Sequence, residues 1–155
     1  MKVTIPYTPR KQQAFIHTEL DKHRFSVLCC HRRFGKTVML INHLIKECMM
    51  NKNHQPRFAY IAPTYSQAKK IAWDYLKFYT KGLPNTKYNE TELRCDFFNG
   101  ARITLLSSEN PDSIRGIYLD GVVCDEASQI SRELIDEVIR PCLLYTSDAA
   151  DDDHC

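Results

Sequence analysis

Hydrophobic and polar residues follow two different periods along this chain. Three short apolar runs, FSVLCC (25–30), RFAYIA (57–62) and LDGVVC (119–124), predict buried strands. Residues 37–50 carry apolar side chains on nearly every face, which predicts a helix enclosed in the core. Further helices are predicted over 9–20, after a T-x-x-Q capping box at Thr64, and over 131–140, where Pro141 is expected to end the helix.

The segment from 92 to 108 changes to an alternating pattern. Leu93, Cys95 and Phe97 alternate with polar residues, and Asn99-Gly100 separates this run from a second one. An Asn-Gly pair between two alternating runs predicts a β-hairpin. Strands that alternate with helices predict an α/β three-layer sandwich with a mainly parallel sheet, which this one antiparallel hairpin interrupts.

Candidate chemistry begins at the end of the first apolar run. CCHRRFGKT places Gly35-Lys36-Thr37 between a predicted strand and a predicted helix, as in a phosphate-binding loop (Walker A). The usual first glycine of that motif is replaced by Cys30, which we expect to hold a negative φ. Alone, the segment fits a basic turn about equally well. The predicted nucleotide-binding residues here are Cys30, His31, Arg33, Phe34, Gly35, Lys36 and Thr37.

An acidic pair follows the third apolar run. Asp125 is positioned to hold Mg²⁺ together with the Thr37 hydroxyl, and Glu126 to act as general base on a water molecule (Walker B). An exposed acidic strand end is the simpler interpretation of this pair alone. Because ligands bind at the carboxyl ends of parallel strands, both segments in this order predict a P-loop NTPase that uses ATP and Mg²⁺.

Two further segments are candidates for nucleotide contact. Arg32 could stabilise transition-state charge as an arginine finger supplied in cis, with a solvated loop arginine as the alternative. In YTPRKQQ, Gln13 could contact an adenine edge and Tyr7 could stack on the base, although a polar helix start explains the segment equally well. Arg115 could contact phosphate, DNA or a neighbouring subunit.

The charge of the chain is strongly asymmetric. Residues 1–87 carry 16 Lys/Arg and four Asp/Glu, whereas residues 88–142 carry five and eleven. A basic half suggests a polyanionic partner, nucleotide or nucleic acid, although composition alone favours a solvated basic face. No apolar run approaches the roughly 20 residues that cross a bilayer, and we expect neither a signal peptide nor a membrane partner. The seven cysteines form no C-x-x-C pair and are expected to be reduced, mostly core thiols.

Several segments together resemble the ATPase domain of large terminase subunits of tailed bacteriophages, over roughly residues 5–141. They are YTPRKQQ, VLCCHRRFGKTVMLINHLI, PRFAYIAPTYSQAKKIAWDYLK and NGARITLLSSENPDSIRGIYLDGVVCDEASQ. The resemblance implies that a non-glycine is tolerated at Cys30. It also implies roles for Arg32 as the loop arginine, Lys36 and Thr37 as the P-loop pair, Asp125 as the Mg²⁺ ligand, Glu126 as the catalytic glutamate and Gln13 as an adenine contact.

What this family implies is a motor that hydrolyses ATP to translocate double-stranded DNA into a procapsid. It implies a homo-oligomeric ring, usually a pentamer, on the portal protein, a small terminase subunit as partner, and a location in the cytoplasm of the infected bacterium with transient docking on the procapsid. The family's nuclease domain is not expected in this chain. A further strand of this fold would lie between 25–30 and the Asp-Glu strand.

The acidic tail is unlike the rest of the chain. Residues 1–142 are expected to be the N-terminal part of the ATPase domain, and 143–155 a non-native tail. Two alternative functions remain open at this point. Asp125-Glu126-Ala127-Ser128 also resembles the DExx helicases, and a nucleotide-binding fragment without turnover would carry the same motifs.

Overall fold

Residues 2–143 are described by a computed structural model of the chain. They form one five-stranded sheet in the order β2-β3-β4-β1-β5. The strands are β1 (Arg57–Ala62), β2 (Lys87–Asn89), β3 (Arg94–Asp96), β4 (Arg102–Ser107) and β5 (Gly121–Cys124). The sheet is mixed: β1 pairs in parallel with β4 and β5, whereas β2, β3 and β4 pair antiparallel. The predicted α/β fold is therefore confirmed.

The predicted hairpin joins β3 to β4. Cys95 is opposite Ile103 in the antiparallel ladder, and the turn closes through the Gly100 N–H, which donates to the Phe97 carbonyl at 3.0 Å. Gly100 has φ +82°, a left-handed conformation that explains the glycine of the Asn-Gly pair. The short strand β2 was not predicted from the sequence.

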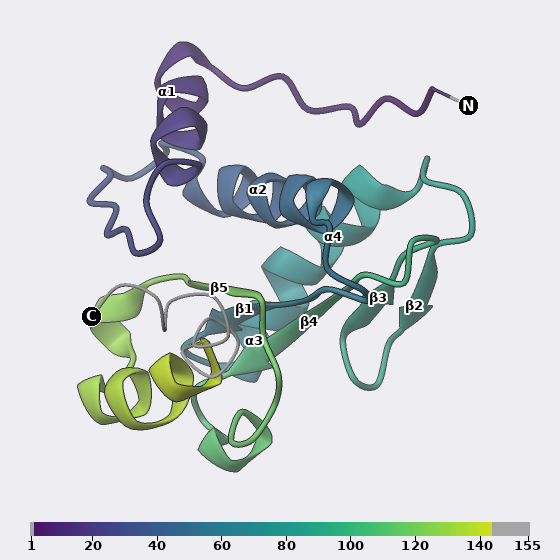
Figure 1. Cartoon of the computed structure of the whole chain (residues 1–155). Helices are drawn as coiled ribbons and strands as arrows, with labels where there is room; N and C mark the ends of the chain where they lie inside the picture. The colour runs from purple at the N-terminus through teal and green to yellow at the C-terminus, as the bar shows by residue number, and fades with distance from the viewer. Residues whose placement is uncertain (1, 144–155) are drawn as a thin grey trace, which may run out of the picture.

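Helices cover both faces of the sheet (Figure 1). On one face, α2 (Lys36–Met50), the π-helix η1 (Ala68–Ala72) and α4 (Trp73–Thr80) bury an apolar core that includes Ile45, Trp73 and Leu76. On the other, the π-helix η4 (Leu134–Ile139) packs Leu134 and Val138 against the sheet. Strand β1 supplies both layers, because its side chains alternate between the faces.

The remaining helices begin close to their predicted positions. Helix α1 spans Lys11–Leu20, and α3 spans Tyr65–Gln67 with Thr64 as N-cap, whose hydroxyl accepts the Gln67 N–H at 3.2 Å. Short 3-10 turns occupy η2 (Pro111–Ser113) and η3 (Ala127–Gln129). The C-terminal helix continues through Pro141 to residue 143, so its predicted end is wrong. The wide π turns before Pro141 alter the spacing to the preceding carbonyls with which a proline ring would otherwise clash.

The apolar run over residues 25–30 does not form the predicted buried strand. Val27 is 91% exposed and Phe25 is 52% exposed. A strand needs a neighbour for its backbone hydrogen bonds, and among the described strands β5 pairs only with β1. No described residue supplies the strand that the family resemblance places between β5 and 25–30. Without that neighbour, the apolar character of the run does not produce a strand.

Three further expectations concern the acidic tail, membrane spans and the cysteines. The predicted non-native tail lies outside them, apart from residue 143. Among residues 2–143, no helix combines the length and apolar character that a membrane span requires. Of the cysteines described, Cys48, Cys95 and Cys142 are buried, Cys30 and Cys124 are half-buried and Cys29 is exposed; all six are free thiols.

Candidate active site

The loop between residues 30 and 35 turns directly into α2. Gly35 has φ +83°, and a Cβ atom added there would lie 2.9 Å from Arg10 Nη2 and 3.0 Å from Gln13 Nε2. Glycine is therefore favoured at this position by its left-handed conformation, and a larger residue would also displace the ends of the Arg10 and Gln13 side chains. Arg33 also has a positive φ, of 64°, whereas Cys30 does not, as predicted. The missing first glycine thus costs the loop no left-handed strain at Cys30.

Helix α1 braces this loop from its N-terminal end. The Gln13 amide donates from Nε2 to the carbonyls of Phe34 at 3.3 Å and Gly35 at 3.4 Å, and its Oε1 accepts the Arg10 N–H at 2.9 Å. The Arg10 guanidinium donates to the same Phe34 carbonyl. Gln13 is buried, so its amide is committed to the protein in this structure. The role of Arg10 was missed from the sequence, where only the basic character of YTPRKQQ pointed to it.

The central contact of the site joins α2 to the end of β5. Thr37 Oγ1 donates to Asp125 Oδ2 at 2.8 Å, and the Tyr60 hydroxyl donates to the same oxygen at 2.5 Å. Asp125 is only 8% exposed, so its carboxylate depends on these donors. Burial, together with the charge of Asp125, raises the pKa of Tyr60, which keeps its hydroxyl a donor. Tyr60 was missed because it reads as an ordinary strand residue of β1.

Glu126 stands directly beyond this contact. Its backbone has φ 49° and ψ 49°, and its N–H donates to Asp125 Oδ1 at 2.9 Å. A left-handed non-glycine residue costs about 1–2 kcal/mol, and such strain concentrates at functional sites. The Glu126 side chain is exposed, and its Oε2 accepts a hydrogen bond from Gln129 Nε2 at 2.7 Å. The turn thus directs the two adjacent carboxylates differently: Asp125 inward and Glu126 toward solvent.

The charged side chains of the loop have different environments. Lys36 Nζ donates to the Cys30 carbonyl at 3.3 Å, so the ammonium lies back across the loop. His31 Nδ1 lies 2.6 Å from the Arg32 carbonyl, and its ring contacts Phe34 edge to face. Arg32 and Arg33 are exposed. Among the described residues, the structure brings together Lys36, Thr37, Asp125 and the backbone of Glu126. It shows no contact between the Arg32 and Glu126 side chains.

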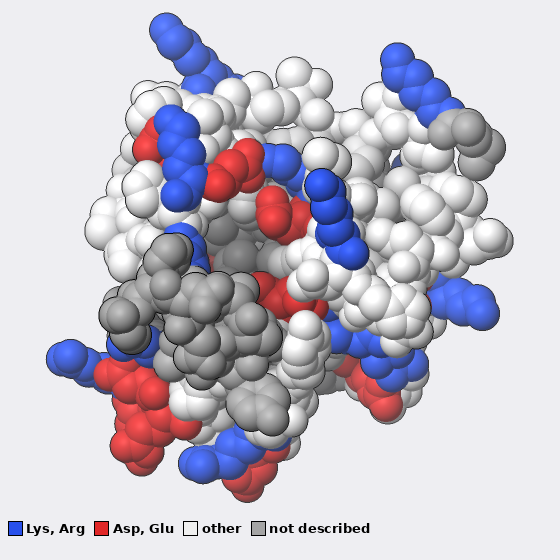
Figure 2. Space-filling view, viewed as in Figure 1, with Lys and Arg blue, Asp and Glu red and all other residues white. Residues whose placement is uncertain are grey.

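The lysines of the helix after Thr64 are not gathered into a separate basic site. Lys77 forms an ion pair with Glu90 at 3.1 Å, and Lys81 lies 4.6 Å from the centroid of the Phe78 ring. Arg115, another candidate, pairs with Asp112 at 3.5 Å. On the face drawn in Figure 2, some Lys and Arg side chains project singly among uncharged residues and others lie beside Asp and Glu. These observations favour a solvated mixed surface there over a continuous DNA track.

Comparisons with solved structures give close overall matches. The large terminase ATPase domain of Thermus phage P74-26 superimposes with a TM-score of 0.70 at 24% identity, covering 92% of this chain and 63% of that one. The large terminase of a second, thermophilic bacteriophage gives 0.70 at 20% identity, covering 85% and 36%. The same terminase in complex with ATP-gamma-S gives 0.66 at 17% identity, covering 85% and 34%. This chain therefore spans less than two thirds of each matched chain.

At these identities the structural matches establish the fold. A comparison with curated protein sequences gave no match. The family itself is established by a sequence match over residues 31–145, which include Gly35-Lys36-Thr37, Tyr60 and the acidic strand end. The chain belongs to the family described as terminase large subunit, T4likevirus-type, N-terminal.

Proposed function

We propose that this chain is the ATP-hydrolysing part of a phage DNA-packaging motor. The observation that carries the proposal is the contact between Thr37 Oγ1 and Asp125 Oδ2 at 2.8 Å. It joins the first turn of the helix after the phosphate loop to the end of the acidic strand, which are the two elements that phosphate-transfer enzymes of this class use. Family membership supports a packaging ATPase over a DExx helicase.

The residues fit a Mg²⁺ ion. Magnesium prefers oxygen ligands and keeps several bound waters. The protein therefore needs to supply only a few ligands, such as one hydroxyl and one carboxylate. Thr37 and Asp125 supply these two groups, and the buried Asp125 carboxylate is held in place by Tyr60. When bound, the ion would neutralise charge on the β- and γ-phosphates. Because Thr37 already lies beside Asp125, little rearrangement of the protein is needed.

The remaining residues take roles in binding and proton transfer. The backbone of residues 30–37 and the Lys36 ammonium would hold the phosphates at the positive end of α2. Glu126 would accept a proton from the attacking water, for which its exposed carboxylate must leave Gln129. Arg32, exposed on the loop, is free to turn toward the γ-phosphate. Gln13 would fix the loop through Phe34 and Gly35, and an adenine contact by its amide requires these hydrogen bonds to rearrange.

Family membership supports a proposal about the partners. We propose that hydrolysis at this site drives double-stranded DNA into a procapsid, in a homo-oligomeric ring, a pentamer, docked on the portal protein and supplied by the small terminase subunit. The structure of the ATP-gamma-S complex concerns a relative that this chain matches over 34% of that relative's length. The site would act in the host cytoplasm and, transiently, at the procapsid.

Nucleotide binding and turnover can be separated by experiment. Binding of a fluorescent ATP analogue and release of phosphate are measured on the purified chain, with Mg²⁺ and with EDTA, for wild type and Lys36→Ala. We expect Mg²⁺-dependent binding and turnover, both lost in Lys36→Ala. Binding without turnover would favour the alternative of a nucleotide-binding fragment. Nucleotide binding that is the same with Mg²⁺ and with EDTA, and the same in wild type and Lys36→Ala, would contradict the proposal.

A further inference from the structure

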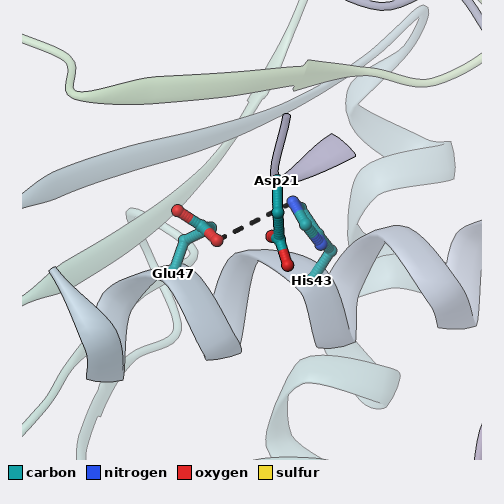
Figure 3. A group of neighbouring side chains, drawn as sticks. All are labelled: Asp21, His43 and Glu47. Carbon is teal, nitrogen blue, oxygen red and sulfur yellow. Dashed lines mark ion pairs between the residues drawn. The ribbon is translucent and has the colours of Figure 1, made fainter. Parts of the chain in front are cut away.

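A second group of ligand-type side chains lies away from the phosphate loop. Asp21, the C-cap of α1, meets His43 and Glu47 of α2, and one ligand atom from each lies within 4.8 Å of the others. His43 and Glu47 are four positions apart, so they share one face of the helix. Figure 3 shows the Asp21 side chain entering between the other two. Among residues 2–143, this is the group of three His, Cys, Asp or Glu side chains whose ligand atoms lie close enough together to hold one metal ion.

Contacts at Nδ1, the nitrogen that does not face Glu47, orient the imidazole of His43. Its Nδ1 lies 3.0 Å from Nδ1 of His17, and the two rings stack with centroids 5.2 Å apart. Nε2 of His17 in turn lies 2.9 Å from the Tyr7 hydroxyl. This chain of hydrogen bonds leaves Nε2 of His43 facing Glu47, whose Oε1 is 3.9 Å away. The donor and acceptor roles in this chain depend on the tautomers, and a His43 with its proton on Nδ1 has the Nε2 lone pair available for an ion.

The two carboxylates have capacity left for a cation. Glu47 Oε1 faces His43 Nε2 at 3.9 Å, which is too long for a hydrogen bond. Asp21 uses Oδ2 for Lys46, at 2.5 Å, which leaves Oδ1 for another partner. Asp21 is exposed, so an ion could enter from solvent.

We propose that His43, Glu47 and Asp21 bind a divalent transition metal ion, with Zn²⁺ as the best match. One imidazole with two carboxylates is a donor set suited to zinc, and water would complete the four ligands. His17 and Tyr7 would act as the outer hydrogen-bond partners that fix the tautomer of a ligating histidine. The ion would link the end of α1 to the middle of α2.

This site differs from the Mg²⁺ site in both chemistry and place. Thr37 and Asp125 offer hard oxygen ligands, whereas here a nitrogen donor favours a softer ion. The two are nevertheless mechanically connected. Helix α2 begins at Lys36, and α1 carries Gln13, which holds the phosphate loop. Binding that ties α1 to α2 would therefore stabilise the bracing of the loop.

Zinc binding tests the proposal without any assay of ATP hydrolysis. The chelator-treated chain, carrying Cys29→Ser and Cys30→Ser to remove the exposed thiol and its neighbour, is titrated with Zn²⁺ by calorimetry. We expect one equivalent to bind, and affinity to fall at least about tenfold in His43→Ala and in the near-isosteric Glu47→Gln. His54→Ala, an exposed histidine outside the cluster, is the matched control and should bind as the parent does.

Cobalt substitution identifies the ligands directly. Co²⁺ in this site should give visible d–d bands without thiolate-to-metal charge transfer, and His43→Ala should abolish them. Circular dichroism confirms that each variant is folded. The proposal is overturned if no zinc binds, if zinc binds equally to His43→Ala and Glu47→Gln, or if the cobalt spectrum shows thiolate ligation.

Discussion

The hydroxyl of Thr37 lies 2.8 Å from Oδ2 of Asp125, although the two residues are 88 positions apart in the chain. One stands at the start of α2 and the other follows the last residue of β5. The parallel pairing of β5 with β1 brings the acidic strand end to the edge where α2 begins. Two signals that are weak separately in the sequence are thus brought together by the topology, and the predictions below depend on that contact.

The hydroxyl of Thr37 should be needed for metal-dependent turnover. Thr37→Ala is expected to lower the ATP hydrolysis rate by about 100-fold, or about 2.7 kcal/mol, because one oxygen ligand of Mg²⁺ is lost. Thr37→Ser keeps the hydroxyl and should remain within a few-fold of wild type. The measurement is phosphate release as a function of Mg²⁺ concentration. Equal rates for the alanine and serine variants would exclude this role.

Tyr60 should stabilise both the fold and the metal site. Tyr60→Phe removes a donor to the buried Asp125 carboxylate and is expected to lower the free energy of unfolding by about 1.5–3 kcal/mol. It should also weaken Mg²⁺-nucleotide binding, because Asp125 loses its fixed orientation. Urea unfolding and nucleotide titration check the two effects. Tyr88→Phe, at a half-buried tyrosine, provides a control: its hydroxyl lies 2.8 Å from Thr80 Oγ1, away from Asp125. Its nucleotide binding should be unchanged.

The two loop arginines should differ in catalysis. For Arg32→Ala we expect nucleotide binding within a few-fold of wild type and a loss of about 10³-fold in kcat, as for an arginine that acts mainly in the transition state. Arg33, left-handed at φ 64° and also exposed, is the comparison: as a predicted nucleotide contact, its alanine variant should keep most of kcat and lose affinity instead. Equal losses in binding and turnover for Arg32→Ala would indicate a ground-state role instead.

The exposed segment before the loop offers a direct structural test. Because Val27 is 91% exposed, Val27→Asp should change the free energy of unfolding of this chain by no more than about 0.5 kcal/mol. Ile61, fully buried in β1, is the reference, and Ile61→Ala should cost about 2–5 kcal/mol. Both are measured by urea denaturation. A severe loss of stability in Val27→Asp would show that residues 25–30 are buried as a strand after all.

Local patterns predicted local structure well in this chain. The Asn99-Gly100 turn and the Thr64 cap carry their own conformational signals, so both were placed correctly. The strand over 25–30 was not, because an apolar run records a tendency to be buried but not the presence of a pairing neighbour. The roles of Tyr60 and Arg10 were not predicted from the sequence for a related reason. Each matters through one long-range hydrogen bond that no periodicity reveals.

The proposed role of Glu126 as general base can be tested most directly. Glu126→Gln removes the proton acceptor while preserving size and backbone, and Gln129→Ala removes only the hydrogen-bond partner of the same carboxylate. In single-turnover experiments with Mg²⁺ and ATP, Glu126→Gln should bind nucleotide normally and lose about 10²–10⁴-fold in the hydrolysis rate. Gln129→Ala should remain far more active. Wild-type turnover in Glu126→Gln would contradict the assignment of this site as an ATPase that uses Glu126 as its base.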